Sequence, residues 1–198
     1  MSLELFDFTQ KSLWISFASI SFNPLFWNIA ARVAEYRTKF ITRLLGGNQY
    51  YGCYALAITI FSLGIFRDYL LVLYKMAIDH QPKSSFLQND LIKGLAALLF
   101  FTGNTFVLSS MYALGVTGTY LGDYFGILMD KRVTSFPFNV LENPMYYGSS
   151  MVFLATALWF ACPTGILLTI WAFILYLIAL QFEGPFTTMI YEKRKKNK

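Results

Sequence analysis

The chain has 198 residues, of which 56% are hydrophobic and only 14% are charged, and its net charge is +5. Soluble domains carry roughly 25% charged residues, so this composition excludes an ordinary water-driven core. The basic residues gather at the C-terminus and form no broad basic face, so no nucleic acid is expected as a partner. A single histidine, His80, excludes a multi-histidine metal site, and no metal is expected. Cys53 and Cys162 cannot form a disulfide framework, and both are expected to be small buried residues.

Long stretches without charge predict membrane helices. No Asp, Glu, Lys or Arg occurs in 94–122 or in 143–182. About 20 apolar residues cross a bilayer core, and only helices and closed barrels satisfy their backbone groups there. No segment alternates with a period of two, so a barrel is not expected. We therefore predict an all-α integral membrane protein, a multi-pass bundle of four to five membrane helices in a single domain, 1–198.

The first apolar stretch, 13–31, is interrupted by Pro24, which removes a helical hydrogen bond. This segment is expected to kink there, and either to span the bilayer or to re-enter one leaflet. Glu4 and Asp7 stand where a cleavable signal peptide has basic residues, so the segment is expected to stay in the mature chain. A polar loop is expected over 32–49.

Two further apolar stretches follow, 50–74 and 94–114. Arg67 lies near the end of the first of them, and the bilayer boundary is expected close to it. The residues between the two stretches, 75–93, are polar, and His80 is expected to be a solvated loop residue.

The segment 115–148 is too polar for a membrane span and too rich in aromatic residues for a disordered loop. Long, specific loops between membrane helices are usually functional. We therefore expect this segment to contribute to function.

The last apolar stretch, 143–182, would extend ~60 Å as one helix, roughly twice the thickness of a bilayer core. The residues Cys-Pro-Thr-Gly at 162–165 indicate a turn near its centre. We therefore predict two helices, 147–161 and 164–182, joined as a tight hairpin. The alternative is one span preceded by a buried amphipathic segment.

The distribution of Lys and Arg predicts the orientation of the chain. With the hairpin, four of these residues in 32–49, two in 115–148 and five in the C-terminal tail lie on one side and five lie on the other, and cytoplasmic loops carry an excess of them. The C-terminus is therefore expected in the cytoplasm. The tail ends Lys-Lys-Asn-Lys at 195–198, which is either a dilysine retrieval signal of the endoplasmic reticulum or a chance match in a basic tail beside anionic lipid.

Several segments resemble one family. LGDYFGILMDKRVTSFPFNVLENPMYYGSS, 121–150, and FNPLFWNIAAR, 22–32, closely resemble the phospholipid methyltransferases. CYALAITIFSLGIFRD, 53–68, is similar to the fungal members that act on phosphatidyl-N-methylethanolamine. The agreement covers nearly the whole chain without large gaps. The resemblance implies an enzyme of the endoplasmic-reticulum membrane that transfers methyl groups from S-adenosylmethionine to the headgroup nitrogen of a membrane phospholipid.

In this family two short motifs contact the cofactor, Gly-any-Gly in the third apolar segment and Glu-Glu near the C-terminus. This chain has Phe101-Thr102-Gly103 at the first motif and Glu183-Gly184 at the second. The resemblance therefore implies that Thr102, Gly103 and Glu183 bind the cofactor. Phe101 fills the space that a glycine leaves for a ligand unless its side chain points away, and Glu183 retains one charge where relatives have two.

A third motif, NPMYYG, resembles the Pro-any-Tyr-any-Gly element with which the wider group of membrane methyltransferases holds its cofactor. The resemblance assigns Asn143, Pro144, Tyr146 and Gly148 to cofactor binding. The hairpin brings these residues to the same membrane face as Glu183, which is the cytoplasmic face where S-adenosylmethionine is made. A single span would separate them by the thickness of the bilayer.

Methyl transfer requires alignment and exclusion of water rather than a nucleophile from the protein. The acceptor amine must lose a proton, which a carboxylate or a tyrosine can take. Asp123, Glu142 and Tyr146 are the catalytic candidates. Alternatively, Asp123 caps a helix or pairs with Arg132, Glu142 is a surface charge, and Tyr146 is an interfacial aromatic residue.

The cofactor candidates have alternatives of the same kind. Asn143 could cap the following helix, Gly103 could allow close helix packing, and Glu183 could be a charge at a helix end. Aromatic faces in 115–148 could hold the methylated headgroup, which is a fixed cation. The candidates for that contact are Tyr120, Tyr124 and Phe125.

We therefore expect S-adenosylmethionine-dependent N-methylation of phosphatidyl-N-methylethanolamine and its dimethyl form to phosphatidylcholine, with phosphatidylethanolamine as a further acceptor. One rival is a methyltransferase with another lipid or a prenyl-cysteine acceptor. The other is a non-catalytic membrane protein that retains the fold and binds lipid or a partner. Cofactor binding separates the last from the enzymes, and acceptor profiling separates the enzymes from each other.

Overall fold

The computed structural model describes residues 5–130 and 133–196, without the side chains of 66–77 and 195. Within these ranges the chain is helical and contains no strand. Five long helices make up most of it: α1 (Lys11–Ile29), α3 (Gln49–His80), α4 (Asp90–Thr119), α5 (Pro144–Trp159) and α6 (Pro163–Lys196). Short elements join them: the π-helix η1 (Ala30–Arg37), α2 (Phe40–Leu44), and the 3-10 helices η2 (Ser85–Leu87) and η3 (Gly122–Phe125).

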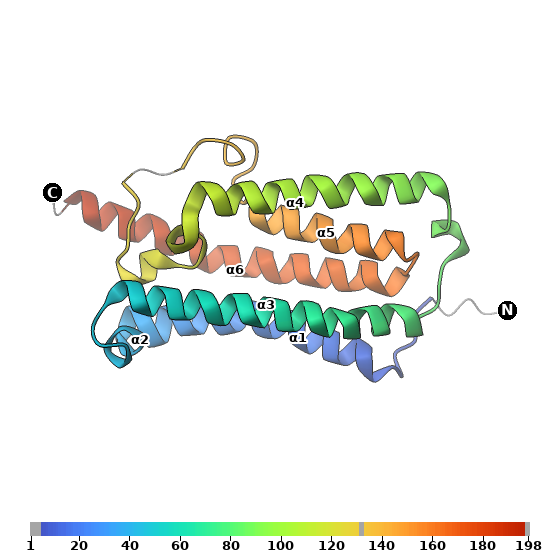
Figure 1. Ribbon diagram of the computed structural model, residues 1–198, viewed down its shortest axis with the longest axis horizontal. Coiled ribbons are helices and arrows are strands. Elements are labelled where there is room, and N and C mark those ends of the chain that lie inside the picture. The colour runs from blue at the N-terminus through green and yellow to red at the C-terminus, as the bar shows by residue number, and fades with distance from the viewer. Residues whose placement is uncertain (1–4, 131–132, 197–198) are drawn as a thin grey trace.

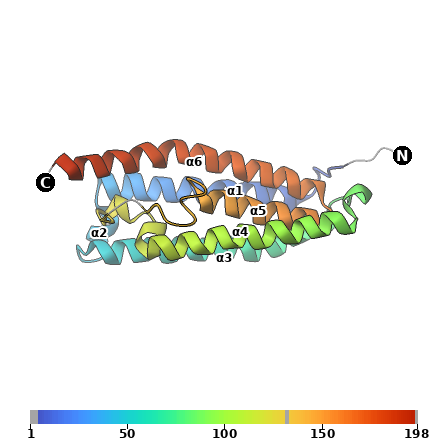
Figure 2. The same ribbon diagram turned by 90° about the horizontal axis from the view of Figure 1, so that it is seen from above.

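The long helices run back and forth along an elongated bundle (Figure 1). α4 packs along α5, α5 along α6, α6 along α1, and α1 along α3. Seen from above, α6 lies along one side of the bundle, α3 and α4 lie along the other, and α1 and α5 lie between (Figure 2). The C-terminus, α2 and η3 gather at one end, which we call the C-terminal end; the opposite end holds the α3–α4 connection and the α5–α6 turn (Figure 1).

The described part of the chain contains two helical segments long and apolar enough to cross a membrane, Asp90–Phe125 and Pro163–Arg194. Many large apolar side chains lie on the outside of the bundle, as lipid contact requires and as water does not favour. On α4 these exposed side chains include Leu91, Leu98, Phe101, Leu108 and Tyr112. Both observations indicate a membrane protein, while the number of crossings stays a prediction.

The predicted hairpin is present as two antiparallel helices. α5 ends at Trp159 and α6 begins at Pro163, a residue that favours the first turn of a helix. Between them Ala161 adopts the left-handed conformation, with φ of 52°. α6 continues past the predicted end at residue 182 to Lys196, because charged residues leave the apolar pattern without ending a helix.

One expectation for the N-terminal third is wrong and another stays a prediction. α1 runs through Pro24 to Ile29 and into η1, because this turn is buried and its packing outweighs one missing N–H, and the kink at Pro24 stays a prediction. The expected loop 32–49 is largely helical. Its turn is held by Glu35, a fully buried acid whose Oε2 and Oε1 accept from the Thr42 N–H at 2.9 Å and the Thr42 hydroxyl at 2.6 Å.

Further along, α3 extends beyond the expected end at residue 74, so His80 is the last residue of a helix rather than a loop residue, although it is exposed. Cys53 and Cys162 are free and fully buried, which confirms the prediction for both. The Arg67 side chain, Arg132 and the last two residues of the tail lie outside the description. The predictions of a bilayer boundary, an ion pair with Asp123 and a retrieval signal therefore stay predictions.

Candidate functional site

The Glu183 carboxylate on α6 is the centre of a hydrogen-bonded cluster built from three helices. Its Oε1 accepts from Trp27 Nε1 and from Asn28 Nδ2, each at 3.0 Å. Its Oε2 accepts from the Tyr146 hydroxyl at 2.6 Å. Trp27 and Asn28 come from α1 and Tyr146 from α5. Three uncharged donors on a half-buried carboxylate fix its orientation, as a binding group for a small ligand requires.

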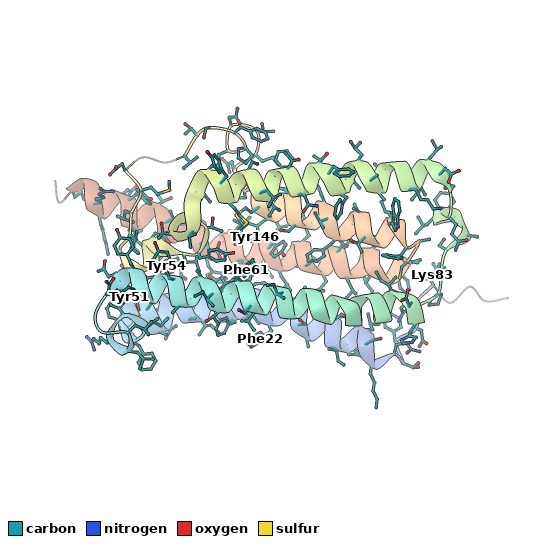
Figure 3. All side chains as sticks on the ribbon, in the orientation of Figure 1. Phe22, Tyr51, Tyr54, Phe61, Lys83 and Tyr146 are labelled. Atoms are coloured by element: carbon teal, nitrogen blue, oxygen red, sulfur yellow. The ribbon has the colours of Figure 1, made fainter. Side chains whose placement is uncertain are left out.

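The donors are themselves held in place. Asn28 Nδ2 also donates to the Pro24 carbonyl one turn earlier, at 3.1 Å, which orients the amide. Tyr146 follows closely after Pro144, which starts α5, and its ring packs against Tyr176 of α6 with 4.9 Å between the ring centroids. Figure 3 shows Tyr146 near the middle of the bundle's length, with Lys83 at the end opposite to the C-terminal end. The hairpin therefore brings the start of α5 beside Glu183, as predicted.

A second acid, Asp123 in η3, lies against the next turn of α6. Its Oδ2 accepts from the Thr187 hydroxyl at 2.7 Å, and its Oδ1 accepts from the Tyr124 N–H at 3.1 Å. Thr187 stands four positions after Glu183, so the two lie on one face of the helix. The site therefore has two carboxylates about one helical turn apart.

A cation joins this face from the beginning of η1. Arg32 Nη2 donates to the Phe182 carbonyl at 2.9 Å. The guanidinium carbon lies 5.1 Å from the centroid of the Phe186 ring and 5.8 Å from that of Phe182, within the range of a cation–π contact. One basic group therefore lies against the turns of α6 that begin next to Glu183.

The glycines of the two other predicted motifs meet each other. A Cβ on Gly103 of α4 would lie 2.6 Å from the Gly148 carbonyl oxygen of α5, and a Cβ on Gly148 would lie 2.6 Å from the Gly103 oxygen. Only glycines let these two backbones approach so closely. The Phe101 side chain is 70% exposed, so it points away and leaves this crossing clear.

The remaining predicted residues lie around these two groups. Thr102 is half-buried beside the crossing, and Pro144 is buried at the start of α5. Asn143 occupies the N-cap of α5, but its side chain makes no capping bond. Glu142 is exposed and has no hydrogen bond or ion pair with the cluster among the described residues. The structure thus joins Asp123, Tyr146 and Glu183 in one group, joins Gly103 with Gly148 in another, and does not bring Glu142 to either.

The prediction that Tyr124 and Phe125 offer free ring faces is wrong. Tyr124 is 1% exposed and stacks on Phe186 with 4.0 Å between the centroids. Phe125 is fully buried and packs where Gly52 of α3 leaves room for its ring. Both rings belong to the core at the C-terminal end of the bundle, because η3 folds inward. The half-buried Tyr120 stays a candidate.

Among the side chains that the structure describes, no three of His, Cys, Asp or Glu come together as a metal site would require. What the cluster offers is negative charge with a fixed orientation, together with one guanidinium. Such a set can bind a cationic or zwitterionic ligand and accept a proton.

Comparison with known proteins decides the family. A family model described as phospholipid methyltransferase matches residues 91–194. The phosphatidyl-N-methylethanolamine N-methyltransferase of Neurospora crassa is 54% identical over 97% of this chain and 88% of its own length. The chain belongs to the phospholipid methyltransferase family. The protein of the same name from Emericella nidulans is also 54% identical, over 97% of this chain and 91% of its own. The phosphatidylethanolamine N-methyltransferase of Rattus norvegicus is 47% identical over 95% and 92%. No solved structure matches.

Sequence reasoning missed the α1 side of this phospholipid methyltransferase site. The family match contains Gly103, Tyr146 and Glu183, but it begins at residue 91 and so does not include Trp27 and Asn28. The sequence did contain a signal for these two residues, because the segment 22–32 resembles the family. That resemblance alone does not assign a role to any residue of the segment. The bonds from α1 join residues more than 150 positions apart, so only the packing of α1 on α6 reveals them.

Proposed function

We propose that the chain methylates the headgroup nitrogen of phosphatidyl-N-methylethanolamine and of its dimethyl form to give phosphatidylcholine, with S-adenosylmethionine as the methyl donor. Phosphatidylethanolamine is a further acceptor. The observation that carries the proposal is the Glu183 carboxylate held by Trp27, Asn28 and Tyr146 in a member of this family. The printed names of the fungal relatives support the acceptor.

The residues present fit the donor. S-adenosylmethionine supplies a methyl carbon bonded to a positively charged sulfur. A carboxylate offers about four lone-pair sites, and the three bonds at Glu183 leave room for one donor from a ligand. A Cβ at the next residue, Gly184, would meet no atom within 4 Å, so that position itself is open.

Each residue of the cluster has a part in this account. Glu183 attracts the positive charge of the donor, and Trp27 and Tyr146 hold the carboxylate and cover it from water. Asp123, fixed by Thr187, is the carboxylate placed to take the proton of the acceptor amine. Glu142 is exposed and is a weaker candidate for that role.

The glycine pair and the start of α5 act on the site through the backbone. Gly103 and Gly148 set the distance between α4 and α5, and α5 carries Tyr146 two positions before Gly148. Thr102, Asn143 and Pro144 flank these positions and stay candidates for contact with the donor.

We also propose that all five long helices cross the membrane of the endoplasmic reticulum, with the C-terminus in the cytoplasm. The basic segments 32–49 and 190–196 lie at the C-terminal end of the bundle (Figure 1). At the opposite end the Thr164 hydroxyl donates to Gln81 Oε1 at 2.8 Å, and the Ser84 N–H donates to the Ala161 carbonyl at 2.9 Å. These bonds join two connections that this topology places together in the lumen.

The test is acceptor profiling with purified protein in detergent–lipid micelles. Labelled S-adenosylmethionine is supplied with phosphatidylethanolamine, its monomethyl form, its dimethyl form or a prenyl-cysteine, each separately. We expect label in phosphatidylcholine from the monomethyl and dimethyl lipids. Label in the prenyl-cysteine alone would replace the acceptor, and no label from folded protein would favour a non-catalytic role.

A further inference from the structure

Arg32 has a position that the proposed function does not yet use. It stands four positions after Asn28 along one continuous helical run, and residues so spaced lie near one another on a helix surface. Asn28 contacts the Glu183 side chain, and Arg32 contacts the carbonyl of Phe182, the residue before it. The guanidinium therefore lies beside the carboxylate cluster.

The guanidinium is incompletely paired. No described carboxylate lies within ion-pair distance of Arg32. Nη2 is bonded to the Phe182 carbonyl, whereas the buried Nε has no hydrogen-bond acceptor among the described residues. Burying a charged donor without a partner is unfavourable, so such groups usually have an acceptor in the functional state.

A second buried polar group lies against the Phe186 ring, on which Arg32 also packs. The Tyr124 hydroxyl is buried and its O–H has no acceptor among the described residues, while its oxygen lies close enough to the Arg32 guanidinium to interact with it. Tyr124 stacks on Phe186, and the Arg32 guanidinium lies over that ring as well. The backbone of Tyr124 is fixed on one side by Asp123 and on the other by the Lys39 ammonium, which donates to its carbonyl at 3.4 Å. Two donors without acceptors thus converge on one place.

We propose that Arg32 binds the oxyanion of a zwitterionic ligand whose positive end faces Glu183. The inference rests on the proposed function, because both ligands of that reaction carry such a pair of charges. In the acceptor lipid, one oxygen and two carbons separate the phosphorus of the phosphodiester from the amine nitrogen. In S-adenosylmethionine, a carboxylate is attached to the carbon that bears the amine. A guanidinium binds either group with two parallel hydrogen bonds.

The spacing of the charges fits this chemistry. Arg32 donates to the carbonyl of Phe182, and Phe182 directly precedes Glu183 on α6. A positive and a negative group of the protein are therefore held at neighbouring positions of this helix. A ligand with an ammonium or sulfonium and an oxyanion only a few bonds apart complements both at once. A ligand with a positive charge alone would leave Arg32 without an acceptor.

The experiment compares Arg32→Gln with Arg37→Gln in full-length protein in micelles. Arg37 is an exposed arginine of the same π-helix with no hydrogen bond or ion pair among the described residues, which makes it a matched control. We expect Arg32→Gln to raise the KM of one ligand at least tenfold with a smaller change in kcat, and Arg37→Gln to change either KM less than twofold. Unchanged KM values for both ligands in Arg32→Gln would overturn the proposal.

Two analogues identify the source of the oxyanion. If it is the lipid phosphodiester, an N-methylethanolamine ether without phosphate is used equally by wild type and Arg32→Gln. If it is the carboxylate of the donor, decarboxylated S-adenosylmethionine binds both proteins equally. If the variant discriminates against both analogues as strongly as the wild type, Arg32 binds neither group and the proposal fails.

Two further measurements separate binding from folding and from catalysis. Arg32→Lys keeps the charge and one bond to Phe182, so its KM should lie between those of the wild type and Arg32→Gln. A purely structural role would instead lower the thermal midpoint and leave analogue discrimination intact.

If the wild type transfers no methyl group, the proposed function fails, but Arg32 can still be tested by binding alone. Equilibrium dialysis then compares the donor with its decarboxylated form, and a lipid-binding assay compares lipids with and without phosphate. Loss of discrimination in Arg32→Gln would then support the site, and its retention would overturn it.

Discussion

The hydroxyl of Tyr146 donates to Glu183 Oε2 at 2.6 Å, and this bond can be removed without removing the ring. We expect Tyr146→Phe to weaken binding of S-adenosylmethionine roughly 10- to 100-fold, since a hydrogen bond to a charged group contributes about 1.5–3 kcal/mol. Equilibrium dialysis measures the affinity. Tyr147→Phe is the control, because the Tyr147 hydroxyl makes no hydrogen bond among the described residues, and an equal loss in both variants would contradict the assignment.

Gly184 tests whether the second carboxylate of the family motif can be restored. A side chain at this position meets open space. We expect Gly184→Glu to fold at least as well, since glycine in a helix costs roughly 1 kcal/mol relative to better helix formers. Affinity for the donor should rise only severalfold, because the position is exposed and solvent screens the added charge. A drop in the thermal midpoint would show that the position is not open.

The residues of the site differ in how far the sequence could predict them. Glu183 and Tyr146 followed from the resemblance, and the structure places them in contact. Trp27 and Asn28 could not be predicted, because their role depends on how α1 packs on a helix far along the chain. For Gly103 the sequence left cofactor contact and close helix packing both open, and only the position of α5 showed the close packing.

The crossing of α4 and α5 predicts a matched pair of substitutions on one helix. Gly103→Ala places a methyl group 2.6 Å from the Gly148 oxygen, so the helices must separate. We expect a loss of about 1–3 kcal/mol of stability, as overpacking typically costs, together with lower activity because Tyr146 moves with α5. Gly94→Ala, where the new Cβ meets no atom within 4 Å, should leave the thermal midpoint unchanged or slightly raised. Equal midpoints for the two variants would contradict the crossing.

Among the elements, the apolar helices were predictable and their ends were not. The charge-free stretches gave α4 and the α5–α6 hairpin, because hydrocarbon demands such composition. The helical structure of 32–49 was missed, because its polar residues satisfy one another: buried Glu35 accepts from Thr42 and contacts Lys39 at 3.4 Å. Polarity alone does not distinguish a solvated loop from such a closed turn.

For the whole molecule, the topology predicts which ends of the helices face the cytoplasm. Lys193→Cys places a thiol at the exposed end of α6, and Phe86→Cys places one between α3 and α4, where Phe86 is 80% exposed. Cys53 and Cys162 are fully buried and should not react. In sealed microsomes with the cytoplasmic face outward, an impermeant maleimide should label Lys193→Cys directly and Phe86→Cys only after permeabilisation. Labelling of both from the same side would exclude the proposed topology.

The central claim is that this membrane bundle transfers methyl groups at the Glu183 cluster. The most direct test is transfer of label from S-adenosylmethionine to phosphatidyl-N-methylethanolamine by purified wild type and by Glu183→Gln, with folding of both verified by thermal unfolding. The account predicts labelled phosphatidylcholine from the wild type and at least a hundredfold lower rate from Glu183→Gln, because the variant loses the charge that faces the donor. Equal rates from the two folded proteins, or no transfer by the wild type, would contradict it.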